Sequence, residues 1–280
     1  MSNKNKKIRR IGLGLVAAVI TPAVLGLAAI ACSRESANDF ASQFLLGPKA
    51  KDYYNSTTKT LDLSQTNLKS IPQAAFSLKT MLRIFTINRE QTRNEIASGI
   101  FSDNTINIER IILPESLELI EKAAFAELSS LKEVTFGNNL KEIQDEAFDK
   151  TSIENLILPS KISTIGKGAF RSNKIKFVNM KDLSQFTILK SGVFANNLLT
   201  EIDLSRVTKI EDGALSQNKF ATLTLPTTLT NVDIDFLDYT YPKNQVPPKV
   251  KLTILDKTTS DKFKEAISKD PSHLFEIVEN

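Results

Sequence analysis

The side chains best suited to covalent or metal chemistry are scarce in this 280-residue chain, which has one cysteine, Cys32, and one histidine, His273. A single cysteine excludes an internal disulfide framework. A single histidine removes most histidine-centred catalysis and nearly all zinc sites, so we expect His273 to be a surface or capping residue. The sequence also has no Gly-x-Ser-x-Gly elbow, no P-loop and no His-Glu-x-x-His motif. We therefore expect neither an enzyme nor a cofactor.

Two short segments have part of the pattern of an ion or phosphate site. Asp233-Ile-Asp235 followed by Asp238 has carboxylates at calcium-loop spacing, but the required glycine and closing glutamate are missing. Gly166-Lys-Gly168 is too short for a phosphate-binding loop and is predicted to be a turn. We therefore expect no metal site.

The sequence before Cys32 indicates that this thiol is a site of lipid attachment. Residues 11–30 form an apolar run, interrupted at Thr21 and Pro22, and a cationic segment precedes it. A cationic segment, an apolar run and small residues at a cleavage point make a secretory signal. The closing Ala29-Ile30-Ala31-Cys32 resembles a bacterial lipobox, although Ala29 stands where Leu is common. The resemblance implies cleavage after Ala31 and a diacylglyceryl group on the Cys32 sulfur.

Other forms of attachment stay open for this leader. The run is about 20 residues long, which is enough for an uncleaved membrane-spanning helix, and plain secretion is a third alternative. Two acyl chains are enough for stable anchoring. Positive charges before the run keep that end in the cytoplasm. We therefore expect the rest of the chain on the extracellular face of the cell membrane.

The basic charge of the chain belongs to the leader. The chain has 36 Lys and Arg against 32 Asp and Glu, a formal net charge of +4. Five of these cations lie in the first ten residues, so the remainder carries 31 basic and 32 acidic side chains. We therefore expect no nucleic-acid partner.

Residues 59–238 consist of repeats of about 23 residues. A bulky residue that ends an Ala-Phe-like step marks each unit, and an alternating apolar pair precedes it. The markers are Phe76, Phe101, Phe125, Phe148, Phe170, Phe194, Leu215 and Phe236. The pairs are Leu61/Leu63, Phe85/Ile87, Ile111/Leu113, Val134/Phe136, Leu156/Leu158, Val178/Met180, Ile202/Leu204 and Leu223/Leu225. Alternation has period two, so each pair predicts a short strand, and strands that recur in one direction predict a parallel sheet.

These units resemble the leucine-rich repeats of the BspA-like family, whose unit reads roughly Leu-x-x-Ile-x-Leu-Pro-x-x-Leu-x-x-Ile-x-x-x-Ala-Phe. Pro114, Pro159 and Pro226 stand at the proline position, and the resemblance covers residues 59–238. It implies an α/β repeat fold, a leucine-rich-repeat solenoid with one parallel sheet and about eight coils. It also implies a bacterial surface lipoprotein that binds partners.

The sequence divides into four expected parts: a signal peptide (1–31), a flexible tether (32–58), the repeats (59–238) and a C-terminal cap (239–280). A short helix in the tether docking on the first repeat is an alternative. The cap is expected to hold a strand over 250–254 and a helix over 261–269 with Ser260 as its N-cap. The second unit is irregular and polar over 89–94, which fits either a terminal cap or a functional loop.

Asparagines follow several markers at a spacing of three residues. They are Asn104, Asn173, Asn197 and Asn218. A stacked amide can satisfy backbone groups in a turn that has no sheet partner. We interpret these residues as structural rather than as ligand contacts.

A binding surface is expected where strand side chains face away from the core. These side chains form two rows: Arg110, Glu133, Asn155, Phe177 and Glu201, and beside them Ile112, Thr135, Ile157, Asn179 and Asp203. Exposed Ile112, Ile157 and Phe177 between acidic residues have the anatomy of an interface. Residues tolerated for their strand propensity would give the same pattern.

Three functions compete on this basis. The first is an adhesin-like protein that binds a protein partner, with host extracellular matrix as a candidate suggested by the family resemblance. The second is an envelope structural or assembly factor that recognises the bacterium's own proteins. Solute capture or catalysis is disfavoured, because the repeats offer neither a cleft between two lobes nor a polar constellation.

Overall fold

The computed structural model describes residues 34–46, 48–87, 100–102, 105–238, 249–270 and 272–278. The chain divides into two compact units, Met1–Ala31 and Cys32–Asn280, and every described residue belongs to the second. The expected leader and Cys32 lie outside the described residues. Within the described ranges no helix has the length and apolar character needed to cross a membrane.

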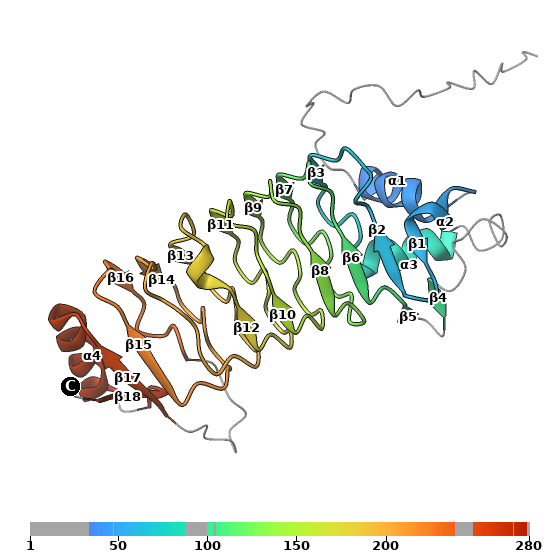
Figure 1. Cartoon of the computed structure of the whole chain (residues 1–280). Helices are drawn as coiled ribbons and strands as arrows, with labels where there is room; N and C mark the ends of the chain where they lie inside the picture. Colours follow the sequence, from blue (N-terminus) through green and yellow to red (C-terminus); the bar gives the residue numbers. More distant parts are fainter. Residues whose placement is uncertain are drawn as a thin grey trace, which may run out of the picture. The chain divides into compact units, whose positions relative to one another are not determined.

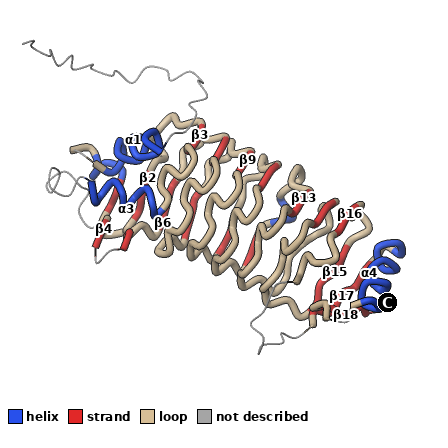
Figure 2. Tube along the Cα trace, turned by 180° about the vertical axis from the view of Figure 1, so that it is seen from behind, coloured by secondary structure: helices blue, strands red, loops and turns tan. Residues whose placement is uncertain are grey.

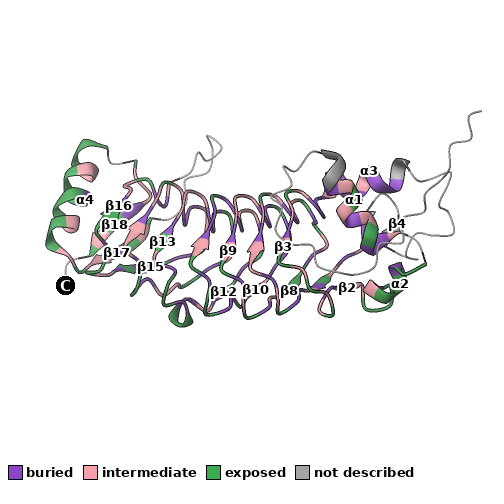
Figure 3. Cartoon of the chain, turned by 90° about the horizontal axis from the view of Figure 1, so that it is seen from above, coloured by how far each residue is buried: buried purple, intermediate pink, exposed green. Residues whose placement is uncertain are grey.

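The repeats form a stack of coils with two rows of short parallel strands (Figures 1 and 2). The first strands are β2 (Thr60–Asp62), β6 (Arg110–Ile112), β8 (Glu133–Thr135), β10 (Asn155–Leu156), β12 (Phe177–Val178) and β15 (Thr222–Leu225). The second strands are β3 (Ser70–Ile71), β7 (Leu119–Ile120), β9 (Glu142–Ile143), β11 (Thr164–Ile165), β13 (Ile188–Leu189), β14 (Lys209–Ile210) and β16 (Asn231–Val232). The expectation of one sheet is corrected to two rows, which run along separate sides of the stack (Figure 3).

The second row arises from an aliphatic residue five positions before most markers, which corresponds to the second Ile of the family unit and was not predicted to form a strand. Ile120, Ile143 and Ile165 are buried, and each pairs in register with its counterpart in a neighbouring coil. A β-branched residue packs well on a pleated, half-buried surface. Most coils therefore bury their core between two short strands. In the coil of Ile202 and Leu204, where a first strand was expected, only the second strand β14 forms.

The marker residues form a column through the middle of the stack. Neighbouring rings from Phe76 through Phe125, Phe148 and Phe170 to Phe194 have centroids 5.5, 5.1, 5.3 and 6.0 Å apart. All five are fully buried, as are Leu215 and Phe236 further along. Burial of a phenylalanine contributes roughly 1.5–3 kcal/mol, and a well-placed ring pair adds about 0.5–1.5 kcal/mol. This column couples each coil to the next.

Two left-handed residues bracket most markers and turn the chain. Two residues before the marker, φ is positive at Ala74, Ala123, Glu146, Gly168, Gly192 and Gly213. Two residues after it, φ is positive at Glu127, Lys150, Ser172, Asn196 and Gln217. Glycine adopts this conformation without a Cβ penalty. Gly168 therefore belongs to a turn, which confirms that expectation for the Gly166-Lys-Gly168 segment.

The asparagines after the markers satisfy backbone groups of adjacent coils, as predicted for Asn173, Asn197 and Asn218. The Asn197 Oδ1 accepts from the Ile175 N–H at 2.9 Å, and its Nδ2 donates to the Phe170 carbonyl at 2.8 Å. Asn173 and Asn218 make the equivalent bonds one coil away in each direction. Asn104 lies outside the described residues.

The second predicted unit is wrong, because no coil intervenes between β2 and β6. Thr60 pairs directly with Arg110 in a parallel ladder. The expected strand at Phe85 and Ile87 is part of a helix, α3 (Leu78–Ile87), and β4 (Phe101–Ser102) with β5 (Thr105–Ile106) forms an antiparallel hairpin. Met81, Ile84 and Phe85 are buried at helical spacing, which outweighs the two-residue alternation. The polar segment 89–94 lies outside the described residues.

The N-terminal segment is folded rather than a flexible tether. It contains α1 (Arg34–Leu45), α2 (Ala50–Tyr53) and β1 (Tyr54–Asn55), which pairs antiparallel with β2. The α1 residues Phe44 and Leu45 are buried, and the Phe44 ring lies 6.2 Å from Phe76. The helix therefore covers the first end of the marker column. A short helix that docks on the first repeat was one expectation for this segment, whereas a flexible tether is wrong for the described residues 34–46 and 48–58.

A strand, a helix and a second strand follow the last coil: β17 (Val250–Ile254), α4 (Lys257–Lys269) and β18 (Phe275–Val278). β17 adds parallel to β15, and β18 adds parallel to β17. The α4 residue Phe263 is fully buried between Phe236 and Phe275. The helix begins earlier than predicted because Asp256, not Ser260, is its N-cap and accepts from the Thr259 N–H at 2.7 Å. β18 was not predicted.

Candidate binding surface

The outward side chains of the first strands form one continuous surface, which we name the first-strand face. Strand register aligns Arg110 with Glu133 and Ile112 with Thr135. One pair of strands further along, Asn155 aligns with Phe177. The period-two pattern placed these six residues on neighbouring positions, and the parallel ladders bring them together in pairs. The other predicted contact residues, Ile157, Asn179, Glu201 and Asp203, lie outside the described strands.

Paired charges occupy the part of this face nearest the N-terminus. The Arg110 Nε lies 2.9 Å from the Glu133 carboxylate, and both side chains are exposed. Beside them Glu109 accepts from Lys59 at 2.6 Å and from Lys132 at 2.8 Å. Hydrogen bonds from Lys132 and Lys59 lower the pKa of Glu109 to about 2. This region is therefore charged but locally neutralised.

The centre of the face is apolar, although it is narrower than the sequence predicted. Ile157 and Phe177 are 56% and 47% exposed; Phe177 lies in β12, and Ile157 directly follows the neighbouring strand β10. Ile112 is only half-buried rather than exposed. Thr135, Asn155 and Glu201 are exposed around this centre.

Two of the predicted contact residues use their polar atoms within the fold. The Asn179 side chain accepts from the Leu158 N–H at 2.8 Å and donates to the Leu158 carbonyl at 2.9 Å. Asp203 accepts from the Ser205 N–H at 2.8 Å, and hydrogen bonds from Ser205 lower the pKa of Asp203. These backbone bonds explain why the two residues are Asn and Asp: Asn179 bonds to the preceding coil, and Asp203 bonds to the turn at Ser205.

The face is hollowed where the N-terminal segment meets it. One hollow of about 740 Å³ extends to Ile157, and a second of about 510 Å³ reaches β1. Residues that line both are Thr58, Arg110, Glu133 and Thr135. Thr58 and the β1 residues were missed from the sequence because a tether would not have contributed to a surface.

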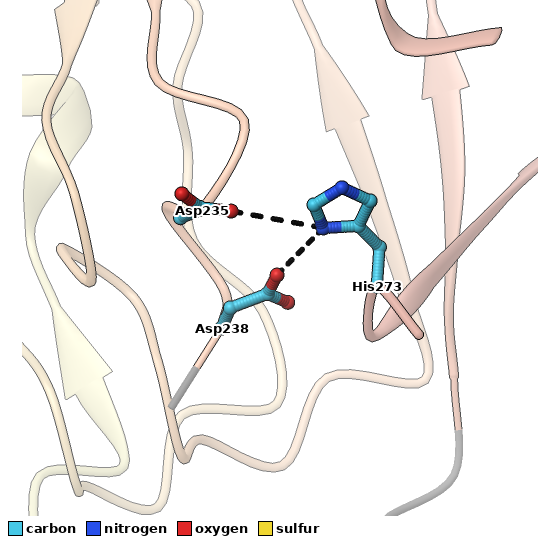
Figure 4. A group of neighbouring side chains, drawn as sticks. All are labelled: Asp235, Asp238 and His273. Atoms are coloured by element: carbon cyan, nitrogen blue, oxygen red, sulfur yellow. Dashed lines mark hydrogen bonds and ion pairs between the residues drawn. The ribbon is translucent and has the colours of Figure 1, made fainter. Parts of the chain in front are cut away.

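A second group of functional side chains lies away from this face, at the end of the last coil. Among the described residues, Asp235, Asp238 and His273 are the group with metal-ligand spacing. The His273 Nδ1 lies 2.7 Å from the Asp238 Oδ2 and 3.7 Å from the Asp235 Oδ1 (Figure 4). The sequence predicted neither a metal site nor the contact of His273 with these carboxylates. Asp238 and His273 are 35 residues apart in the sequence, so no local motif joins them.

Comparison with known proteins places these features in a family. The model of the BspA-type leucine-rich repeat region, with six copies, matches residues 49–176 and 94–222. No curated protein matches the chain.

Solved structures give weaker similarities. The pneumococcal vaccine antigen PcpA is 19% identical over 62% of this chain and 68% of its own, with a TM-score of 0.28. A leucine-rich repeat protein from Bacteroides ovatus is 20% identical over 65% of this chain and 56% of its own, with a TM-score of 0.35. A leucine-rich cell surface protein from Faecalibacterium prausnitzii is 13% identical over 61% of this chain and 59% of its own, with a TM-score of 0.27. The family assignment rests on the family model alone. Since that model matches well over half of the chain, and the coils stack as such repeats do, the protein belongs to the BspA-type leucine-rich repeat family.

Proposed function

We propose that the chain is a membrane-anchored bacterial surface protein that binds a protein partner through its first-strand face, in the manner of an adhesin. The observation that carries this proposal is the exposure of Ile157 and Phe177 beside a hollow with charged walls. Aromatic and aliphatic anchors within a polar rim supply most of the binding energy at protein interfaces. A host extracellular-matrix protein is the first candidate partner.

The test compares binding by the full chain, solubilised in mild detergent, and by variants on each strand row. We expect Ile157→Ala with Phe177→Ala to weaken binding to an immobilised matrix protein by about tenfold or more, since loss of a central anchor removes over 1 kcal/mol. Ile188→Ala is the matched control, because Ile188 is 40% exposed on the second-strand row. Equal binding by the wild type and the double variant would exclude the first-strand face.

The alternative is an envelope structural or assembly role in which the partner is one of the bacterium's own proteins. Crosslinking on intact cells, through a photoreactive group placed at Thr135, distinguishes the two. Thr135 is exposed on the face, and it lines both hollows. Crosslinks to envelope proteins alone would support the assembly role and contradict the adhesin-like one.

The anchor is proposed to be a diacylglyceryl group on Cys32, attached through the only thiol of the chain. Thioether formation requires the sulfur, so Cys32→Ser should release the protein from the membrane. Mass spectrometry of the mature protein should find Cys32 at the N-terminus with the lipid mass. An N-terminus at Met1 would show an uncleaved helix instead, and an unmodified Cys32 would show plain secretion.

A further inference from the structure

The cluster of Asp235, Asp238 and His273 joins two parts of the chain that are distant in sequence. Asp235 and Asp238 lie in the turn after β16, on either side of the marker Phe236. His273 lies in the connection between α4 and β18. One potential ligand atom from each residue lies within 4.8 Å of the others, and Figure 4 shows the imidazole facing both carboxylates.

Surrounding contacts hold two of these side chains in place. The His273 ring stacks on Phe275 with centroids 5.4 Å apart, and the histidine side chain is only 11% exposed. The Asp238 Oδ1 accepts from the Leu274 N–H at 3.1 Å, which leaves Oδ2 facing the imidazole. Metal sites use such secondary contacts to orient their ligands. The third side chain, Asp235, is 51% exposed and gives an ion a path from solvent.

The charges at this position are unbalanced. The carboxylates of Asp235 and Asp238 both face the single imidazole of His273, at 3.7 and 2.7 Å from its Nδ1. A cation between Asp235 and Asp238 would relieve this repulsion between carboxylates.

We propose that Asp235, Asp238 and His273 form a binding site for a divalent transition metal ion, with Zn²⁺ as the best fit. An imidazole nitrogen with two carboxylate oxygens suits zinc better than calcium or magnesium, which prefer oxygen ligands alone. Zinc bonds of about 2.0–2.2 Å place two ligands of a tetrahedral ion about 3.3 Å apart. The observed 2.7 and 3.7 Å lie on either side of that value, so small side-chain rotations suffice. A water molecule takes the fourth position.

Such an ion would fasten the C-terminal segment to the last coil, because two ligands come from the coil and one from beyond α4. A ligand that binds only the folded state raises the unfolding temperature. The competing explanation is a simple ion pair between His273 and Asp238 that binds no metal. It predicts no response to zinc.

The experiment titrates Zn²⁺ into the chelator-treated full chain, produced without a polyhistidine tag and in a Cys32→Ser background that removes the competing thiol. We expect one ion per chain with a micromolar or lower Kd by calorimetry, and a Tm increase of several degrees. Co²⁺ should give the visible absorption bands of a tetrahedral site. Asp235→Asn and His273→Gln should each weaken binding at least tenfold, whereas Asp261→Asn, an exposed carboxylate on α4, should leave it unchanged.

The half-exposed position of Asp235 keeps the test interpretable if His273→Gln fails to fold. Asp235→Asn should retain the metal-free Tm of the parent chain and lose only the response to zinc. Binding that requires millimolar zinc, or that survives in a folded Asp235→Asn variant, would overturn the proposal.

Discussion

Single asparagine side chains close the coils of this stack, because each one bonds to backbone groups that no strand reaches. Asn197 satisfies the Ile175 N–H and the carbonyls of Phe170, Phe194 and Ala195. The spacing from the markers was enough to predict this role, since a buried amide beside a recurrent turn has few other functions. The local repeat therefore determines these residues almost completely.

Removal of one such amide should be strongly destabilising. Asn197→Ala leaves buried backbone groups without partners, at roughly 1–3 kcal/mol for each unsatisfied group. We expect the free energy of unfolding to fall by about 3 kcal/mol in urea denaturation. Asn155→Ala, at an exposed position on the first-strand face, is the control and should change it by less than about 0.5 kcal/mol. Similar losses for both variants would contradict the structural role.

Because of Glu109, the free energy of unfolding should depend on pH. Its pKa is about 2 in the folded chain against an ordinary value of 4.5, so its stabilising effect is present above about pH 4.5. That effect is lost as the pH falls from 4.5 through 2. Glu109→Gln should therefore be less stable than the wild type at pH 7, and the difference should shrink towards pH 2. Urea denaturation at several pH values measures it, with Glu276→Gln as the charge-matched control; a difference constant with pH would contradict the prediction.

The sequence pattern predicted only some residues of the first-strand face and of the cluster around His273. Period two predicts which side chains leave the core, so Ile157 and Phe177 could be located from the sequence. It does not predict that Asn179 bonds to the Leu158 backbone, because the 3-10 helix η1 (Met180–Asp182) interrupts the pattern there. The approach of His273 to Asp238 depends on how α4 and β18 pack, which no local spacing encodes.

At the level of elements, the ends of the stack differ most from the sequence prediction. Short apolar segments fit either a helix or a strand, and only packing decides between them. In α3 the helical face packs inward, whereas the repeat pattern had favoured a strand at Phe85. For α1, the sequence allowed a short helix that docks on the first repeat, but it did not identify Phe40 and Phe44 as the residues that contact Phe76.

The α1 helix should contribute substantially to stability, because it covers the first end of the marker column. Phe44 packs against Phe40, Tyr53 and Phe76, with ring centroids 5.4, 5.0 and 6.2 Å away. We expect Phe44→Ala to reduce the free energy of unfolding by about 3–5 kcal/mol. Gln43→Ala, which alters the exposed side of the same helix, should have little effect. A loss below about 1 kcal/mol for Phe44→Ala would mean that α1 does not dock in solution.

Over the whole molecule, each coil contacts only its neighbours, so stability is close to a sum of coil and interface contributions. Ion pairs such as Lys141 with Glu118 and Lys176 with Glu154 also connect neighbouring coils. These pairs are exposed and contribute little individually. The aromatic column couples the cores of neighbouring coils, and it acts together with the ladders of the two strand rows and the asparagine bonds.

Interruption of that column should reduce cooperativity as well as stability. Phe148→Ala removes a ring that stacks on Phe125 and Phe170, so the two halves of the stack should no longer unfold together. We expect a lower m value or a second transition in urea, followed by circular dichroism. Phe148→Leu is the control, because Leu215 already occupies the equivalent position in another coil. An unchanged m value for Phe148→Ala would show that coupling runs elsewhere.

The number of residues between each strand and its marker shows where the repeats tolerate insertions. Second strands begin six residues before the marker in most coils, as with Leu119 and Phe125 or Ile188 and Phe194. The connection from first to second strand is longer where η1 intervenes, and α3 lies in an insertion between the marker Phe76 and the first strand β6. The η1 turn follows β12, the strand that carries Phe177 of the first-strand face. A peptide grafted beside η1 would therefore be displayed next to Phe177 without a shift in the register of the coils, which makes this position the natural site for engineering a new specificity.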